Sequence, residues 1–90
     1  MELSMQQIFG RVLRQLRKDA GLTQEALGLE ANLQRNYISS IELGEKQPSL
    51  TSIFKLAAAL KITPGKLMDL VELERTHLAR VAESEEDHSI

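Results

Sequence analysis

The chain contains no cysteine, and this absence removes several classes of structure at once. Disulfide bonds, cysteine-bound zinc and iron–sulfur clusters all need thiol groups, so none of them can stabilise this protein. The two histidines, His77 and His88, stand alone without the ligand spacing of a metal site. We therefore expect neither a metal nor any other cofactor.

Aromatic residues make up only 3% of the 90 residues, although 42% of the chain is hydrophobic. The core must then be built from Leu, Ile, Val and Ala, which suits packed helices better than a sheet, where aromatic and β-branched residues are favoured. A chain of this length allows one modest core. No apolar run approaches the roughly 18–20 residues of a membrane helix, and no signal-peptide pattern opens the chain. We expect a soluble cytoplasmic protein.

The formal net charge of -2 hides an uneven distribution. Residues 1–67 carry nine Lys and Arg against six Asp and Glu, a balance of +3, whereas residues 68–90 carry two against seven, a balance of -5. Because a negatively charged partner needs to meet only the first part, the acidic total does not exclude nucleic-acid binding.

Residues 22–44, LTQEALGLEANLQRNYISSIELG, have the pattern of two short helices joined by a tight turn. Thr23 is a good N-cap for the first helix, because its hydroxyl can accept a hydrogen bond from a free backbone N–H. Asn32 stands where the chain must turn, and asparagine tolerates left-handed backbone. Gln34 is a weaker cap for the second helix. Such a pair predicts a helix-turn-helix, whose second helix fits the DNA major groove.

Helix signals on both sides of this segment raise the predicted total to five helices and no strands. Ser4 opens a capping-box pattern, and Gly21 is expected to end the helix that follows. Ser49 and Thr63 are N-caps for a fourth and a fifth helix. The sequence therefore predicts an all-α protein.

The chain carries no helix breaker for many residues after Gly65, so the fifth helix is expected to run to about Ala82. We divide the chain into a helix-turn-helix domain (1–70), a helical C-terminal extension (71–83) and a disordered acidic tail (84–90).

Over roughly residues 7–70 the sequence resembles the Xre family of phage-repressor and Cro-type helix-turn-helix regulators, which implies its five-helix DNA-binding fold. Gly28 departs from the usual Ala, at an expected cost of about 0.5–1 kcal/mol of helix stability. Asn32 replaces the usual turn Gly, and Leu43 replaces a common Arg. The motif residues that carry the resemblance are Leu22, Thr23, Gln24, Leu27, Ala31, Tyr37, Ile38, Ser39, Ile41, Glu42 and Gly44.

Short members of that family include phage-type repressors, antitoxins and the controller proteins of restriction–modification systems. The stretches QRNYIS and SIFKLAAALKI favour the controller type.

Base reading is expected from the polar outward face of the second motif helix. Arg can bond a guanine edge through two hydrogen bonds, and Asn or Gln can do the same for adenine. The alternative is an ordinary solvated helix face. The candidates are Gln34, Arg35, Asn36, Ser39 and Ser40.

Phosphate binding is expected around the motif. Gln24 begins its first helix, where a side-chain amide and free backbone N–H groups can hold a phosphate oxygen, and the family uses the matching Gln in this way. Tyr37, Lys46 and Gln47 are further candidates, although Tyr37 could equally be a packing residue.

The resemblance also implies an ion pair between Arg17 and Glu42, which would tie the first helix to the end of the third. Its role is expected to be structural, since losing one member of a buried pair strands a charge.

Dimerisation is expected to involve the fifth helix. Leu67, Val71, Leu78 and Val81 recur at roughly helical spacing and lie at or beyond the expected end of the domain. Burying each such side chain is worth about 1.5–3 kcal/mol, so two copies of the stripe have reason to pair. The alternative is that the extension folds back on its own domain.

These observations predict a transcriptional regulator that binds a pseudo-palindromic operator as a homodimer, with its third helix in the major groove of double-stranded DNA. No enzyme is expected, because Ser39, Asp69 and His77 have no spacing that would bring them together. The alternative, favoured by the acidic C-terminal segment, is a protein-interaction module such as an antitoxin that binds a toxin. Neither hypothesis involves a membrane.

Overall fold

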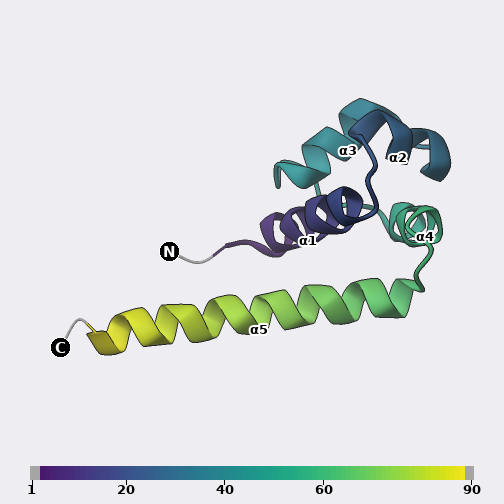
Figure 1. Cartoon of the computed structure of the whole chain (residues 1–90). Helices are drawn as coiled ribbons and strands as arrows, with labels where there is room; N and C mark the ends of the chain where they lie inside the picture. The colour runs from purple at the N-terminus through teal and green to yellow at the C-terminus, as the bar shows by residue number, and fades with distance from the viewer. Residues whose placement is uncertain (1–2, 89–90) are drawn as a thin grey trace.

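The computed structural model describes the backbone of residues 3–88 and the side chains of residues 3–83. Over this part of the chain the structure is all helical, as predicted. Figure 1 shows α1 between the α2–α3 pair on one side and the long α5 on the other, with α4 at one end. The helices are α1 (Met5–Asp19), α2 (Gln24–Ala31), α3 (Arg35–Glu42), α4 (Leu50–Ala59) and α5 (Pro64–His88).

Short polar side chains begin most of these helices where the sequence predicted caps. Ser4 Oγ accepts from the backbone N–H of Gln7 at 3.2 Å, and the Gln7 side chain accepts from Ser4 N–H at 2.8 Å, which completes a capping box. Thr23 caps α2 by accepting from Ala26 N–H at 3.0 Å. The equivalent bonds of Ser49 and Thr63 begin α4 and α5.

Gln34 is the exception among the predicted caps. It occupies the N-cap position of α3 but makes no side-chain capping bond. A glutamine side chain must restrict one more rotatable bond than asparagine to reach back to its own helix, so the capping bond is less favourable. The predicted N-cap position of Gln34 is confirmed, but its side chain does not make the capping bond.

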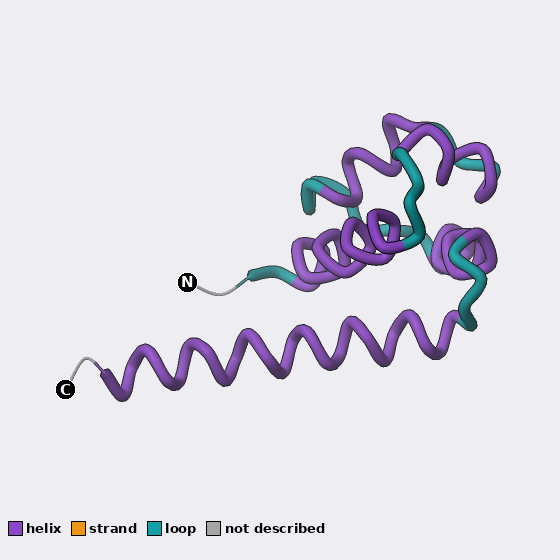
Figure 2. The backbone as a smooth tube through the Cα atoms, viewed as in Figure 1, coloured by secondary structure: helices purple, strands orange, loops and turns teal. Residues whose placement is uncertain are grey.

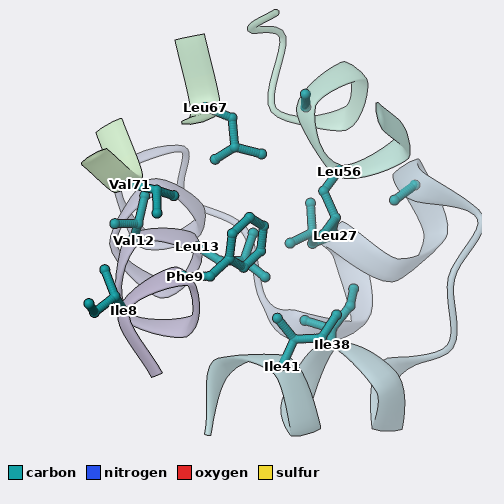
Figure 3. Close-up of a cluster of buried hydrophobic side chains, with 12 residues drawn as sticks. Ile8, Phe9, Val12, Leu13, Leu27, Ile38, Ile41, Leu56, Leu67 and Val71 are labelled. Atoms are coloured by element: carbon teal, nitrogen blue, oxygen red, sulfur yellow. The ribbon is translucent and has the colours of Figure 1, made fainter. Parts of the chain in front are cut away.

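One apolar core joins all five helices (Figure 3). Each helix contributes at least one fully buried aliphatic side chain: Leu13, Leu27, Ile38, Leu56 and Leu67. Phe9 is the one aromatic side chain in the buried cluster of the described residues. As the scarcity of aromatic residues predicted, the core is built mainly from Leu, Ile, Val and Ala.

The path of α5 differs from the expectation that its apolar stripe is free for a second copy. The chain reverses near Lys61, where φ is 60°, and α5 packs back against α1 and α4 (Figure 2). Leu67 and Val71 are therefore 0% and 1% exposed, and Leu78 packs against the same core. The assignment of Leu67 and Val71 to a dimer interface is wrong, because their own chain already buries them. For the half-buried Leu78 and for Val81 this assignment stays a prediction. Val81, at 40% exposure, stays at the surface.

The helix α5 is also longer than predicted. Its backbone remains helical to His88, past the expected end near Ala82, because no Gly or Pro follows Gly65 and glutamate is a good helix former. Of the tail predicted for 84–90, residues 89 and 90 lie outside the described residues. How the chain divides into units stays a prediction. Among the helices of the described part, none has the length and apolar character that crossing a membrane requires.

The turn between α2 and α3 explains why Gly28 is a glycine. Asn32 takes the predicted left-handed conformation (φ 54°, ψ 47°), and Leu33 N–H then bonds the carbonyl oxygen of Gly28 at 2.9 Å. This brings the Leu33 carbonyl oxygen within 2.6 Å of the place where a Cβ on Gly28 would stand. A glycine is therefore required at position 28 because the chain returns so close to it. The departure from the usual Ala, seen in the sequence alone, could not show this reason.

We predict that Gly28→Ala lowers the free energy of unfolding by about 1–3 kcal/mol, because the added methyl meets backbone that cannot easily move. Helix propensity alone gives the opposite sign, a gain of about 0.5–1 kcal/mol. Thermal unfolding followed by circular dichroism measures the difference. Glu30→Ala, at an exposed position of the same helix, is the control and should change little. A raised melting temperature for Gly28→Ala would contradict the steric argument.

Candidate nucleic-acid interface

The helix α3 is buried along one face and exposed along the other. Ile38 and Ile41 are 0% exposed and anchor it in the core, with α1 and α2 as its main neighbours. On the opposite face Arg35 and Asn36 are exposed, and Ser39 is half-buried. The outward side of α3 is thus a polar surface on a firmly held helix, which is what base reading requires.

The N-terminal end of α3 is open. Gln34, Arg35 and Asn36 are all exposed and make no side-chain hydrogen bond within the described residues. In a helix-turn-helix the N-terminal residues of the second helix contact base edges. The structure therefore brings the three strongest candidates for base reading together at the expected place.

Ser40 differs from the other candidates on this face. It is half-buried, and its hydroxyl donates a hydrogen bond to the carbonyl oxygen of Asn36 at 3.0 Å. Its proton is therefore used within α3, and only its oxygen can accept a bond from a base.

The predicted ion pair between Arg17 and Glu42 is present and nearly buried. Arg17 Nε lies 2.7 Å from Glu42 Oε2, and Nη2 donates to Oε1 at 3.0 Å, so the pair is bidentate. The two side chains are 11% and 3% exposed. The hydrogen bond with Glu42 raises the pKa of the Arg17 guanidinium above its usual value, against the effect of burial. The Arg17 guanidinium therefore stays charged across the physiological range.

This pair is the centre of a wider network. Arg17 Nη1 also donates to the carbonyl oxygen of Leu22 at 2.8 Å, and Gln24 Nε2 donates to Glu42 Oε1 at 3.1 Å. The end of α1, the loop before α2, the first residue of α2 and the last residue of α3 are thereby joined. The family pattern predicted the pair, but the part played by Gln24 was missed, because nothing in the spacing shows that its amide reaches Glu42.

Close backbone contact supports the same junction. A Cβ on Gly10 would meet the carbonyl oxygens of Ile41 and Glu42, so α1 approaches the last turn of α3 as closely as a glycine allows. The position of α3 is therefore set both by the ion pair and by this contact.

The phosphate candidates occupy different environments. One donor of the Gln24 amide is already bonded to Glu42, while its oxygen and the backbone N–H groups of Gln24 and Glu25 make no hydrogen bond within the described residues. Lys46 and Gln47 are exposed in the loop that follows α3. Gln24, Lys46 and Gln47 remain predictions as phosphate contacts.

Tyr37 has a structural partner. It is half-buried, and its hydroxyl oxygen accepts a hydrogen bond from the backbone N–H of Ser49 at 3.2 Å, which connects α3 to the start of α4. Burial raises the pKa of the Tyr37 phenol, but the hydroxyl of Ser52, the backbone of Ser49 and the charge of Lys46 together lower it below its usual value. Tyr37 therefore packs within the domain. A contact between Tyr37 and a phosphate would have to be a hydrogen bond that its hydroxyl proton donates, because the oxygen already accepts from Ser49 N–H.

We predict that Glu42→Ala lowers the free energy of unfolding by about 3–5 kcal/mol, because it leaves the buried Arg17 unpaired. Thermal or denaturant unfolding measures the loss. Arg35→Ala, an exposed change on the same helix, should stay within about 0.5 kcal/mol of the parent chain. Equal stability of the two variants would show that the pair does not hold α3.

The geometry described above defines a helix-turn-helix domain, and comparison with known proteins agrees. The model of the helix-turn-helix family HTH_3, which is of Xre type, matches residues 13–67, and the chain belongs to this family.

Among its relatives, the control protein C.BamHI of Bacillus amyloliquefaciens is 39% identical over 67 residues, which cover 73% of this chain and 83% of that protein. The crystal structure of the restriction-modification controller protein C.AhdI from Aeromonas hydrophila has a TM-score of 0.67 at 44% identity, covering 69% of this chain and 94% of that one. The controller protein C.Esp1396I, solved as a tetramer with its natural 35 base-pair operator, has a TM-score of 0.76 at 25% identity. The match covers 83% of this chain and 99% of that one.

Proposed function

We propose that the chain is a sequence-specific DNA-binding transcriptional regulator that reads a pseudo-palindromic operator as a homodimer. In this proposal α3 lies in the major groove, and the first residues of α2 and the loop after α3 meet the phosphates on either side. The protein acts as a binder of DNA, with no reaction of its own, in the cytoplasm.

The observation that carries the proposal is the exposed polar end of α3. Arg35 and Asn36 have the two side chains best suited to reading guanine and adenine, and both are exposed on a helix whose other face is fully buried. The named relatives support this use, since one of them is solved on its operator. The controller proteins among these relatives also favour a controller of a restriction–modification system over other regulators of the family.

We predict that Arg35→Ala and Asn36→Ala each weaken binding to the preferred duplex by about 1–3 kcal/mol and relax the base preference at one position of each half-site. Lys46→Ala should instead weaken binding to all duplexes alike and reduce the salt dependence. Selection from a randomised duplex library, followed by titration, measures both effects. A uniform loss of affinity in all three variants would show that α3 does not read bases.

A single domain of this size reads only a few base pairs, so a second copy is needed to lengthen the site. The surface for it must differ from the buried stripe of α5. An apolar patch, called here the α4 patch, is formed by Met5, Leu50, Ile53, Phe54 and Met68. Leu50 and Phe54 are 72% and 56% exposed and lie one turn apart on α4, and Ile53 lines one small hollow with Met5 and Met68. We place the two-fold contact on this patch.

We predict that Phe54→Glu raises the dimer dissociation constant by about tenfold or more, because it puts a charge into the apolar contact. Sedimentation at several concentrations measures the change. Leu73→Glu is the matched control. Leu73 is 67% exposed on α5, outside the α4 patch, and lines a separate groove between α5 and α1. If Leu73→Glu gave monomers and Phe54→Glu did not, the contact would lie on that groove.

A further inference from the structure

One apolar side chain lies on the face of α3 that is otherwise polar. Leu43 follows the last residue of α3, yet it keeps helical angles (φ -79°, ψ -6°), and its N–H bonds the carbonyl oxygen of Ser39 at 3.0 Å. The helical spacing therefore extends to Leu43. Leu43 lies three residues after Ser40, four after Ser39 and seven after Asn36, and this spacing puts all four side chains on one side of the helix.

The burial of the neighbouring residues confirms this orientation. Ile41 and Ile38, two and five residues earlier, are 0% exposed, whereas Leu43 is 65% exposed. Among the exposed large hydrophobic residues of the described part, Leu43 alone belongs to α3 or its cap. It takes no part in the buried core.

We propose that Leu43 is a specificity-determining residue that contacts the 5-methyl group of a thymine in the operator. The inference rests on the proposed function, since it needs α3 in the major groove. There the base edges present hydrogen-bond donors and acceptors, and the thymine methyl is the one apolar feature. A leucine can neither donate nor accept a hydrogen bond, so covering a polar edge would leave that edge unsatisfied, whereas covering the methyl removes apolar surface from water on both sides.

The position of Leu43 limits where the thymine lies. Seven residues of helix separate it from Asn36, a rise of about 10 Å along the axis. The contacted base pair should therefore lie within about three base pairs of the position whose preference depends on Asn36. The Arg that is common at this position in the family would form hydrogen bonds with a base edge. The leucine therefore predicts a different base preference at this base pair.

The experiment uses the full chain and a duplex that it has itself selected from a randomised library. Each thymine of that duplex is replaced singly by uracil, which removes only the methyl group, and the dissociation constant is measured. For the parent chain we expect one thymine in each half-site at which this change weakens binding about fourfold, the effect of one buried methyl-sized group. In Leu43→Ala the same replacement should have no effect, although the variant binds more weakly overall.

Two further variants make the result specific. Leu29→Ala removes an 80% exposed leucine from α2 and should keep the full fourfold sensitivity of the parent chain to uracil. Leu43→Met keeps an apolar side chain of similar size and should retain most of it. Because Leu43 is exposed, unchanged melting of Leu43→Ala is expected and excludes misfolding as the cause.

Several outcomes would overturn the inference. Uracil sensitivity that persists in Leu43→Ala shows that another residue covers the methyl. The absence of any sensitive thymine in the parent chain, or weaker binding of Leu43→Ala to all duplexes alike, assigns Leu43 to the sugar–phosphate backbone. If the parent chain bound the selected duplex no better than a scrambled one, the proposed function itself would fail, and the inference with it.

Discussion

The buried pair of Arg17 and Glu42 is the interaction on which the arrangement of this protein depends. The helix α3 has only eight residues, and two of them, both isoleucines, are buried in the core. The nearly buried pair adds a second anchor at the end of α3. A bidentate contact fixes orientation as well as distance, because the guanidinium and carboxylate planes must match. The bonds from Arg17 to Leu22 and from Gln24 to Glu42 extend this constraint to the start of α2. The pair therefore connects both helices of the motif to α1.

The central place of α1 follows from the same arrangement. It meets α3 on one side and α5 on another, so a single helix connects the exposed polar face of α3 to the C-terminal helix. Gly10 allows the approach on the α3 side, and Val12 is buried in the same core as Val71 of α5. A long C-terminal helix thus closes the domain over much of its length.

Local signals in the sequence predicted most of the fold. Caps such as Thr23 and the turn at Asn32 act within a few residues, so the residue type alone indicates the backbone. The family pattern added the Arg17–Glu42 pair, whose members are 25 residues apart. The errors concern partners that spacing cannot identify. An apolar stripe on α5 shows that something covers it, but not whether this is α1 or a second chain. Gly28 likewise looks like a weak helix residue until the return of Leu33 is seen.

The sequence predicted which residues belong to the candidate site better than it predicted the hydrogen bonds that they make. The exposed positions of Arg35 and Asn36 follow from helical spacing, whereas the bonds of Ser40 and Tyr37 depend on neighbours that only the structure shows.

This difference separates two kinds of residue on α3. Tyr37, Ile38, Ile41 and Glu42 hold the helix in place, so a change at any of them shifts the whole exposed face of α3. Arg35, Asn36 and Leu43 are exposed and take no part in the core, so the free energy of folding hardly depends on their identity. If α3 reads bases as proposed, base preference can change by substitution at the exposed positions while the domain stays folded. Under the proposed function, the same stable framework serves regulators with different operators, and the identity of the exposed side chains decides which operator is bound.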